Sequence, residues 1–599
     1  MKPLACVDFE TKAINGALPP VPVGVAILLP KQRPFYLAWG HASDNNCNKE
    51  KAVRILKDVF ETHDVLFHNS QFDLAVAKYH LGIDYPSTVH DTLFLLFLRN
   101  PHAKTLSLKP CADEVLGWAP DEQQTLYSWI IANVKNATHK NAGAFISEAP
   151  GSMVEPYAIG DVERTLALFN ELYPKYKGEA YTRECKLVKI LTDNTLRGVR
   201  LNLHRLSKDF EYYSDVKNTV DNRIYLLLGS RFNIDSSEEL ANAISKSNIN
   251  VNWVLTPTGK RSTSKPNLIK AISNEPILLG LLNYRSTLAT YLETFFTSWL
   301  DKQVDSRIHF TWNQVRNQEQ EKKGLMGTRT GRLSSVPSML NVPGTPPEYN
   351  PELDLPPLPH MRSYLIADEG LVWLKRDYSQ QELRVLAHYE DGMLMEAYAK
   401  NPSLDMHTFM SEVLSNTTGR PISRKTTKNM AFGLLYGMGL ALLAEKMECS
   451  YEEAATIKKL YLNAVPGIRS VQSAIKDKWS NGLPFKTFGG RLYYKEESKM
   501  VVDKATGLPR LQDFIYKGLN YLIQGSSADI TKQAIINYSE LSRSGFYQIA
   551  VHDEINIQGP VEEMKLLKEA MTDLPLDVEL LSEGFMGQSY GELQDFVEA

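Results

Sequence analysis

The spacing of apolar residues changes along this 599-residue chain, and that change constrains the architecture more than any single motif does. Residues 1–170 alternate short apolar runs such as LACVDF and VGVAILLP with helical stretches, which is typical of an α/β layer. From about 180 to 300, long amphipathic segments predict helices packed on one another. Because one hydrophobic core cannot serve a chain of this length, we expect about three to five domains, of α/β and α+β type.

The second half contains a strong break in regular structure. Residues 343–359 hold seven prolines, too many for a helix or a central strand, so we expect a surface excursion there. The run LVWLKRD that follows predicts a strand, and mostly helical sequence continues to about residue 480. Near the end, FYQIAVHDEINIQG predicts a hairpin with His-Asp at its turn. The polar stretch 259–266 (GKRSTSKP) predicts an exposed loop.

Composition excludes several classes of protein. No apolar run approaches the roughly 20 residues needed to cross a bilayer, and MKPLACVDFETK lacks the apolar centre of a signal peptide. The five cysteines are scattered without a CxxC pair, which argues against a disulfide framework or a zinc site. We therefore expect a cytoplasmic protein without a membrane partner. The net charge of −4 does not exclude a nucleic-acid partner, because screening makes local patches the relevant unit.

Acidic residues in the first 170 positions suggest a metal site. In VDFET, Asp8 and Glu10 lie two apart in a predicted strand and so project from the same face. Alone, such a pair is more often a solvated strand face. However, Asp73 ends HNSQFD, and in YAIGD Tyr157 lies one helical turn before Asp161. Four carboxylates from three separated elements, with a phenol able to orient a water, suit Mg²⁺ ligation.

These acidic motifs resemble the three motifs of the DEDDy class of 3′–5′ exonucleases. The segment LSLKPCADEVLGW (106–118) is similar to the one that this family carries between its second and third motifs. The resemblance implies an RNase H-like exonuclease domain over residues 1–175, in which two Mg²⁺ ions, or Mn²⁺ in their place, activate a water and stabilise the leaving 3′-oxygen. The implied metal ligands are Asp8, Glu10, Asp73 and Asp161, with Tyr157 as a further catalytic residue. A folded but inactive remnant is the alternative.

A stripe of cations and rings marks residues 424–437, RKTTKNMAFGLLYG. Arg424, Lys428, Phe432 and Tyr436 recur at every fourth position, so they form a gently spiralling stripe on a helix. The cations at its start suit a triphosphate, and the rings suit a base or sugar. Glycines beside the rings would let a base pair close against the backbone. A buried bundle helix with a basic end is the alternative interpretation.

Together with Asp377 in DYSQQELR and Asp553 in HDE, this stripe resembles the three motifs of family A DNA polymerases, the polymerase I type. TRTGRLSSVPSMLNVP, DMH, TFGGRLYY and NYLIQGSSADI also occur in the family's order. Polar Gln381 and the pair Ser526–Ser527 depart from the usual pattern, but no charged or ring-bearing site residue is lost. The resemblance implies a right-hand architecture with these parts: thumb 180–305, palm 306–385 and 490–599, fingers 386–489.

The resemblance also implies roles for individual residues. Asp377, Asp553 and the main-chain carbonyl of Tyr378 would hold two Mg²⁺ ions, and Lys428 would protonate the leaving pyrophosphate. The implied nucleotide contacts are Gln380, Glu382, His407, Arg424, Lys428, Phe432 and Tyr436. The implied contacts with primer and template are Arg332, Arg491, Asn520, Gln524 and His552.

We therefore expect template-directed DNA synthesis from deoxynucleoside triphosphates with 3′–5′ proofreading, in replication or repair. The expected partners are primer–template DNA and these nucleotides, with a replisome helicase or a processivity factor as further candidates. A start at the exonuclease, without a 5′-nuclease domain, favours a bacteriophage enzyme in an infected bacterial cell. A single-subunit RNA polymerase is one rival, against which Glu382 argues because it would block a 2′-hydroxyl. A catalytically silent DNA-binding or scaffold protein is the other.

Overall fold

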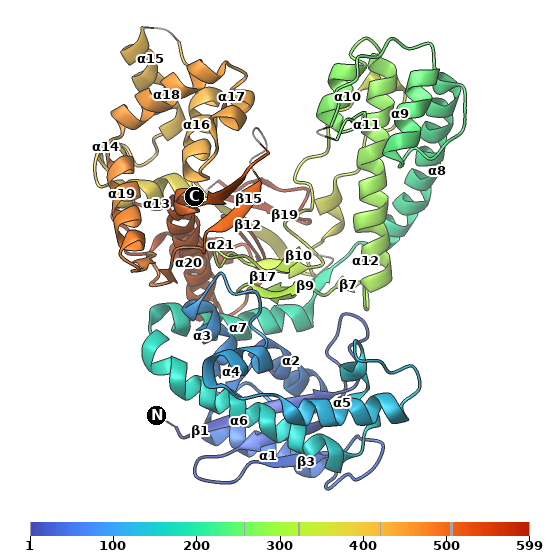
Figure 1. The fold of residues 1–599 in the computed structure, drawn as a ribbon, viewed down its shortest axis with the longest axis vertical. Helices are drawn as coiled ribbons and strands as arrows, with labels where there is room; N and C mark the ends of the chain where they lie inside the picture. The colour runs from blue at the N-terminus through green and yellow to red at the C-terminus, as the bar shows by residue number, and fades with distance from the viewer. Residues whose placement is uncertain (1, 257, 321–323, 420, 503–506, 598–599) are drawn as a thin grey trace.

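The computed structural model describes residues 2–256, 258–320, 324–419, 421–502 and 507–597. Two five-stranded sheets form the framework. In Figure 1 the amino-terminal sheet lies at the bottom, the second sheet lies at the centre, and two helical lobes rise on either side of the second sheet. The fold thus combines an α/β part with an α+β part, as the sequence predicts.

The amino-terminal sheet has the order β3-β2-β1-β4-β5, with β1 antiparallel to β2 and parallel to β4. Its strands are β1 (Leu4–Thr11), β2 (Pro22–Leu28), β3 (Phe35–Ala38), β4 (Asp64–Phe67) and β5 (Val89–Asp91). Its helices are α1 (Lys49–Thr62), α2 (Ser70–Leu81), α3 (Thr92–Arg99), α4 (Leu108–Leu116), α5 (Asp121–Asn133) and α6 (Gly151–Tyr176). Because helices pack on this sheet, its central strand β1 is largely buried, and its first four residues, LACV, are apolar.

Helix α7 (Glu179–Arg197) joins the two sheets and belongs to both cores. Val188 packs in the amino-terminal core, whereas Leu187 and Leu191 pack in the core of the second sheet. The fully buried Glu184 of this helix accepts hydrogen bonds from Lys532 at 2.6 and 2.8 Å. Apolar packing on two sides and a buried ion pair therefore fix the amino-terminal part against the rest of the molecule.

The second sheet is antiparallel, with the order β17-β18-β12-β19-β20. Its strands are β12 (Val372–Tyr378), β17 (Phe546–Val551), β18 (Glu554–Gly559), β19 (Ser582–Gly587) and β20 (Gln594–Asp595), and helices α20 (Gly518–Leu541) and α21 (Glu563–Thr572) pack against each other beside it. The structure confirms the predicted strand LVWLKRD as β12 and the predicted hairpin as β17 and β18. The sheet brings the ends of these strands together.

The lobe drawn in orange follows β12. It comprises α13 (Gln381–Glu390), α14 (Met393–Lys400), α15 (Met406–Thr418), α16 (Arg424–Leu435), α17 (Leu440–Met447), α18 (Tyr451–Ala464) and α19 (Gly467–Ser480). Two short hairpins link it to α20: β13 (Phe485–Lys486) with β14 (Leu492–Tyr493), and β15 (Lys499–Val502) with β16 (Pro509–Gln512). Within the described ranges, no helix is both long and apolar enough to cross a membrane.

The green lobe has a small core of its own. Its helices are α8 (Leu203–Leu228), α9 (Ser237–Lys246), α10 (Lys265–Ala271), α11 (Pro276–Thr290) and α12 (Thr297–Lys302), with a π-helical turn at Tyr291–Phe296. The predicted loop 259–266 is too long by two residues, because α10 begins at Lys265. Pro266 is compatible with this start, since the first turn of a helix needs no proline N–H.

The proline-rich segment 343–359 is irregular apart from a 3₁₀ turn at Pro351–Leu353. It is less detached than a surface excursion would be. Tyr213 of α8 donates a hydrogen bond to the carbonyl of Pro357 at 2.7 Å, and Tyr284 of α11 donates one to Pro356 at 2.9 Å. Prolines leave these carbonyls without a helical partner, and the two phenols bind the segment to the green lobe.

The remaining strands are short and lie around the second sheet. They are β6 (Val199–Arg200), β7 (Arg307–Ile308), β8 (Thr311–Asn313), β9 (Asn317–Gln320), β10 (Gly324–Met326) and β11 (Ser334–Val336). β6 pairs with β7, β8 with β11, and β9 with β10. The chain thus passes between the green lobe and β12 through small two-stranded units.

Candidate active sites

Three carboxylates converge in the amino-terminal domain. Asp8 and Glu10 lie on β1, and Asp161 lies on α6; one ligand atom from each lies within 4.8 Å of the other two. The two-residue spacing on a strand and the packing of α6 on β1 produce this cluster. Asp73, on α2, lies outside this group of three; it is buried, and its Oδ1 accepts a hydrogen bond from the Phe9 N–H at 3.0 Å.

The electrostatics of this cluster suit a divalent cation. Burial, and then repulsion from Asp161, raise the pKa of Asp8 to about 7, although the positive charge of Lys109 opposes the shift. Burial, and then Asp8, also raise the pKa of Glu10 well above its usual value. Carboxylate oxygens are ligands that Mg²⁺ prefers, and a bound divalent cation would relieve the repulsion between them. Tyr157 lies one turn before Asp161 on α6, as predicted, and is buried.

Two cations beside this cluster were not predicted. Lys109 Nζ lies 2.5 Å from Asp161 Oδ2 and 3.9 Å from the centroid of the Tyr157 ring. Arg164 NH1 lies 3.9 Å from Asp161 Oδ1. The three-residue spacing of Asp161 and Arg164 on one helix was a signal for the second contact. The first involves the segment 106–118, which the sequence marked as family-like, but no spacing rule indicated the contact because Lys109 lies on a separate helix, α4.

A second pair of acids lies in the central sheet. Asp377 is near the end of β12, and Asp553 is in the turn between β17 and β18. The Tyr378 N–H donates a hydrogen bond to the Asp553 carbonyl at 3.1 Å, which holds the strand end against the turn. Burial, and then repulsion from Asp553 and Glu554, raise the pKa of Asp377 to about 7. Burial also raises the pKa of Asp553. The pair therefore also suits a divalent cation.

The side chains of Tyr378 and Glu554 form hydrogen bonds with other residues of the protein. The Tyr378 hydroxyl donates a hydrogen bond to the Met571 carbonyl at 2.8 Å, so its side chain lies in the core and only its main chain remains for the site. Glu554 accepts hydrogen bonds from Lys375 at 3.2 Å and from the Tyr590 hydroxyl. Lys375 and Tyr590 were not predicted from the sequence. Alternation along β12, which puts Lys375 on the same strand face as Asp377, was the available signal for the first.

Helix α16 carries the predicted stripe. Ser423 caps its start by accepting a hydrogen bond from the Thr426 N–H. The Phe432 and Tyr436 rings stack with centroids 5.8 Å apart and planes 4° apart. The helix ends at Leu435, so Tyr436 is its C-cap and not its last helical residue. The structure thus brings the two rings together at the end of the helix.

The cationic end of the stripe lies beside α15. Lys428 Nζ lies 5.9 Å from the centroid of the Phe432 ring, and the His407 ring centroid lies 6.0 Å from it. Arg424 Nε is paired with Asp405 at 2.6 Å. Burial lowers the pKa of His407 to about 4, despite the nearby Asp405, so His407 is neutral at pH 7. The Phe432 ring, the two cations Arg424 and Lys428, and the neutral His407 thus lie close together.

Glu382 and Gln380 follow β12 directly. The Glu382 carboxylate pairs with Arg332 through one oxygen and accepts a hydrogen bond from the Tyr436 hydroxyl through the other. Gln380 has a φ of +57°, and its amide oxygen accepts hydrogen bonds from Tyr398 and from the Met406 N–H. The Gln380 side chain is thus hydrogen-bonded within the protein, and it ties the end of β12 to α14 and α15.

The glycines of the stripe have neighbours that differ from the prediction. A Cβ on Gly437 would lie 2.6 Å from the Tyr516 ring, and the residue has a φ of +62°. A Cβ on Gly433 would lie 2.7 Å from Leu443. Both glycines therefore permit close packing between protein segments, where we expected the approach of a base pair.

Three of the predicted DNA contacts meet at a cavity of about 400 Å³, which Arg332, Gln524 and His552 line. Asn520 lies one turn before Gln524 on α20, and its buried Oδ1 has no hydrogen-bond partner among the described residues. Arg491 is the exception. Its side chain is 1% exposed, with NH2 at 2.6 Å from Asp529 and 3.3 Å from Glu184. The structure thus contradicts a DNA contact by Arg491, whose guanidinium completes a buried ion cluster.

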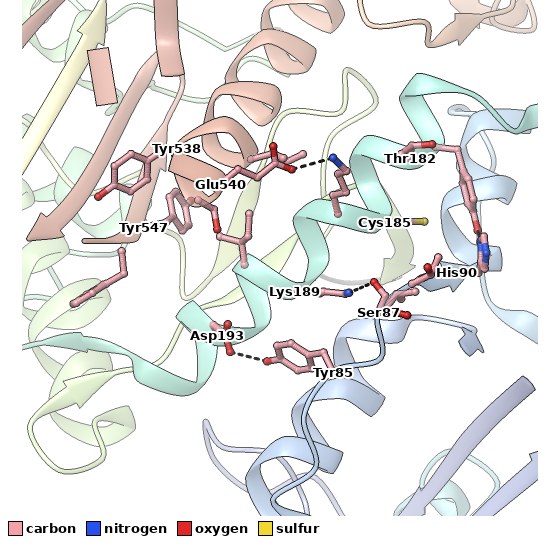
Figure 2. Close-up of a pocket in the computed structure, with 18 of the residues that line it drawn as sticks. Tyr85, Ser87, His90, Thr182, Cys185, Lys189, Asp193, Tyr538, Glu540 and Tyr547 are labelled. Atoms are coloured by element: carbon pink, nitrogen blue, oxygen red, sulfur yellow. Dashed lines mark hydrogen bonds and ion pairs between the residues drawn. The ribbon is translucent and has the colours of Figure 1, made fainter. Parts of the chain in front are cut away.

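Another cavity lies away from both acid sites. It measures about 650 Å³ and lies along α7, between the amino-terminal domain and the end of α20 with β17. As Figure 2 shows, contacts across this seam include Tyr85 with Asp193 at 2.8 Å and Lys189 with the Ser87 carbonyl at 2.8 Å. Its lining, as described, includes none of the predicted site residues. The seam therefore belongs to the joint between domains.

Known protein families match the two parts of the chain separately. Residues 202–592 match the family model for DNA polymerase family A. The chain belongs to DNA polymerase family A. Residues 7–177 match the model for the 3′–5′ exonuclease domain, so this family A chain carries its exonuclease domain before its polymerase domain, in the order expected. Domains of both kinds generally use divalent metal ions.

Relatives of this family A chain come from bacteria and from phages. It is 25% identical to DNA polymerase I of Chloroflexus aurantiacus over 93% of the chain and 58% of that protein. It is 25% identical to a DNA polymerase of Salmonella phage PMBT28 over 92% of the chain and 90% of that protein. The chain spans about half the length of several bacterial relatives that it matches. The phage relative is thus the more similar of the two in length.

A solved structure has the same fold. The polymerase domain of Pol1 from M. smegmatis, in complex with DNA primer-template and dNTP, superposes with a TM-score of 0.74 at 21% identity. The match covers 98% of this chain and 95% of that one. The likeness therefore extends over both domains of the family A chain.

Proposed function

We propose that this family A chain synthesises DNA on a primer–template from deoxynucleoside triphosphates and removes mispaired 3′ ends with its exonuclease domain. The observation that carries the proposal is the presence of two separate acid sites, each with carboxylates whose pKa values are raised by burial and by one another. One lies in the exonuclease domain and the other in the central sheet beside the stripe of α16. Synthesis and proofreading need two such sites.

In the polymerase site, Asp377, Asp553 and the Tyr378 carbonyl would hold two Mg²⁺ ions. When bound, these ions lower the pKa of the primer 3′-hydroxyl and neutralise the triphosphate. Lys428 would donate a proton to the leaving pyrophosphate, since it stands on the surface that Phe432 and His407 share. Charged donors of this kind stabilise phosphate oxygens.

Other residues would position the nucleotide and the duplex. Arg424 and His407 would bind phosphate oxygens, Phe432 would face the sugar or base, Tyr436 would lie next to the template, and Glu382 would pack under the sugar. Gln380 would act indirectly, by holding the turn after β12. The residues that line or adjoin the 400 Å³ cavity would contact primer and template: Arg332, Asn520, Gln524 and His552. Minor-groove acceptors are nearly independent of sequence, so such contacts sense base-pair shape.

In the exonuclease site, Asp8, Glu10, Asp73 and Asp161 would together hold two divalent ions. Tyr157 would orient the attacking water. The hard oxygen donors of this cluster fit Mg²⁺, with Mn²⁺ as a substitute. The proposal places both activities in one chain, each with its own metal ligands.

The domain assignment is part of the proposal. Helices α8 to α12 with their separate core support a thumb over residues 180–305, and α13 to α19 support fingers over 386–489. The central sheet supports a palm over 306–385 and 490–599. Similarity to bacterial and phage polymerases supports work in the cytoplasm of a bacterial or phage-infected cell, in replication or repair. A helicase or a processivity factor remains a candidate partner.

Separation of the two activities tests the proposal. Asp8→Ala with Glu10→Ala is expected to abolish degradation of a labelled 3′ end while Mg²⁺-dependent primer extension persists. Asp553→Ala is expected to stop extension and spare degradation. Loss of both activities in either folded variant, or extension that survives Asp553→Ala, would refute the two-site assignment.

A further inference from the structure

The two carboxylate oxygens of Asp161 have different surroundings. Its Oδ2 accepts a hydrogen bond from Lys109 Nζ at 2.5 Å, and the two side chains are only 8% and 12% exposed. Its Oδ1 is buried and has no hydrogen-bond partner among the residues that the structure describes. One oxygen of a proposed metal ligand is therefore occupied by a cation of the chain itself, and the other is not.

Local sequence does not favour Lys109 at its position. Lys109 is the second residue of α4, and the first turn of that helix contains no acid. A cation there opposes the helix dipole, which favours negative charge at the N-terminus. Partial burial of an ammonium is unfavourable as well unless it is paired. Two contacts offset these unfavourable terms: one with the Asp161 carboxylate, and one with the Tyr157 ring at 3.9 Å.

The neighbouring arginine does not perform the same role. Arg164 binds both oxygens of Glu122 and donates to the Ala119 carbonyl at 2.8 Å. Its distance of 3.9 Å from Asp161 Oδ1 exceeds that of a hydrogen bond. Arg164 is therefore largely neutralised outside the cluster, whereas the charge of Lys109 is directed to the cluster.

We propose that Lys109 is a resident cation of the exonuclease site, which leaves Asp161 one free oxygen and competes with a second divalent ion for the other. This inference rests on the proposed exonuclease function. A first ion, held by Asp8, Glu10 and the free oxygen of Asp161, would be compatible with Lys109 in place. A second ion that uses Asp161 Oδ2 requires Lys109 to withdraw. Lys109 is thus a positioning residue that sets how much divalent metal the site needs.

Metal binding itself provides the test. Mn²⁺ titrations followed by electron paramagnetic resonance would use the full chain with Asp377→Asn and Asp553→Asn, so that only the exonuclease site is measured. Adding Lys109→Met is expected to tighten the weaker of two Mn²⁺ binding steps by about tenfold or more, because a competing charge a few ångströms away is gone. The stronger step should tighten less. Lys109→Gln should behave like Lys109→Met, whereas Lys109→Arg should keep the weak second step.

Lys78 provides a matched control. Its Nζ also pairs with an aspartate, Asp193, at 2.9 Å and also lies over a tyrosine ring, that of Tyr85, at 4.3 Å. Lys78→Met therefore removes the same kind of contact outside the acid cluster, and both Mn²⁺ steps should stay as in the parent. A thermal melt of each metal-free variant shows that the protein titrated is folded.

The outcomes are distinguishable. Two measurable binding steps that are the same in the parent, Lys109→Met and Lys109→Gln would overturn the role of Lys109 and leave the exonuclease proposal standing. No saturable Mn²⁺ binding in any folded variant would overturn both. The inference also predicts that the Mg²⁺ concentration for half-maximal 3′-end hydrolysis falls in Lys109→Met with the polymerase carboxylates intact, and an unchanged value would contradict it.

Discussion

The Tyr436 hydroxyl donates a hydrogen bond to Glu382 Oε2 across 3.2 Å. Glu382 lies in the first turn of α13, directly after the strand that carries Asp377, and Tyr436 caps α16. Arg332 pairs with the other oxygen of the same carboxylate. The bond therefore links the end of α16 to the helix that follows β12, so a movement of α16 would change the contacts of Glu382.

Glu382 should determine the choice of sugar. Glu382→Ala removes the carboxylate that we place under the incoming sugar, so ribonucleotide incorporation should rise relative to deoxynucleotide by about tenfold or more. Glu382→Gln is the matched control, because it keeps the side-chain volume and should keep most of the discrimination. The measurement is the ratio of kcat/KM values for matched ribo- and deoxynucleotides. An unchanged ratio in Glu382→Ala would remove Glu382 from the sugar site.

Phe432 should reject a nucleotide that lacks its 3′-hydroxyl. The Phe432 ring has no hydrogen-bonding group with which to replace the interaction that a dideoxynucleotide loses, and such a loss costs on the order of 1–3 kcal/mol. We expect roughly tenfold or greater discrimination in the parent. Phe432→Tyr adds a hydroxyl and should largely erase that preference. Competitive incorporation in an Asp8→Ala, Glu10→Ala background measures it, and equal use by the parent would contradict the assignment.

His407 should make the free energy of unfolding depend on pH. Burial lowers its pKa to about 4 in the folded chain, below the ordinary value of 6.5, so the folded state binds fewer protons between these values. Stability should therefore rise with pH from about 4 to 6.5, by roughly 3 kcal/mol from this residue. His407→Asn should remove that part of the slope. Urea unfolding of both proteins at pH 4.5 and 7 measures the difference, and parallel pH profiles would contradict the shift.

The buried ion cluster at α7 should hold the two domains together. Glu184 and its partner Lys532 are each 1% exposed, so Glu184→Gln leaves buried cations without their counter-charge. Breaking such a pair costs about 3–5 kcal/mol. Glu540→Gln is the matched control, since Lys186 and Glu540 join the same two helices but are 54% and 60% exposed, and such a pair contributes about 0–1 kcal/mol. Chemical denaturation should separate the two variants clearly, and similar losses would contradict this account.

Residue spacing along the chain was sufficient to predict the local geometry of both acid sites, and the motifs were sufficient to predict the family. Spacing translates directly into direction within one element: two residues apart on β1 places Asp8 and Glu10 on one face, and four apart on α16 aligns Lys428 with Phe432. A proline run, an apolar run and a turn between two apolar runs likewise predicted the irregular segment, β12 and the β17–β18 hairpin. These predictions held because each depends on backbone geometry over a few residues.

Which charged side chains pair with one another depends on the packing of elements that lie far apart in the sequence. Lys109 reaches Asp161 across 52 positions, and Lys532 reaches Glu184 across 348. Arg491, expected at the DNA, is instead buried in that second cluster. No spacing rule covers such pairs, because the distance between residues on different elements depends on how those elements pack. Whether an arginine faces a ligand or a buried carboxylate is then determined by the free energy of removing its charge from water, which only its final neighbours can offset.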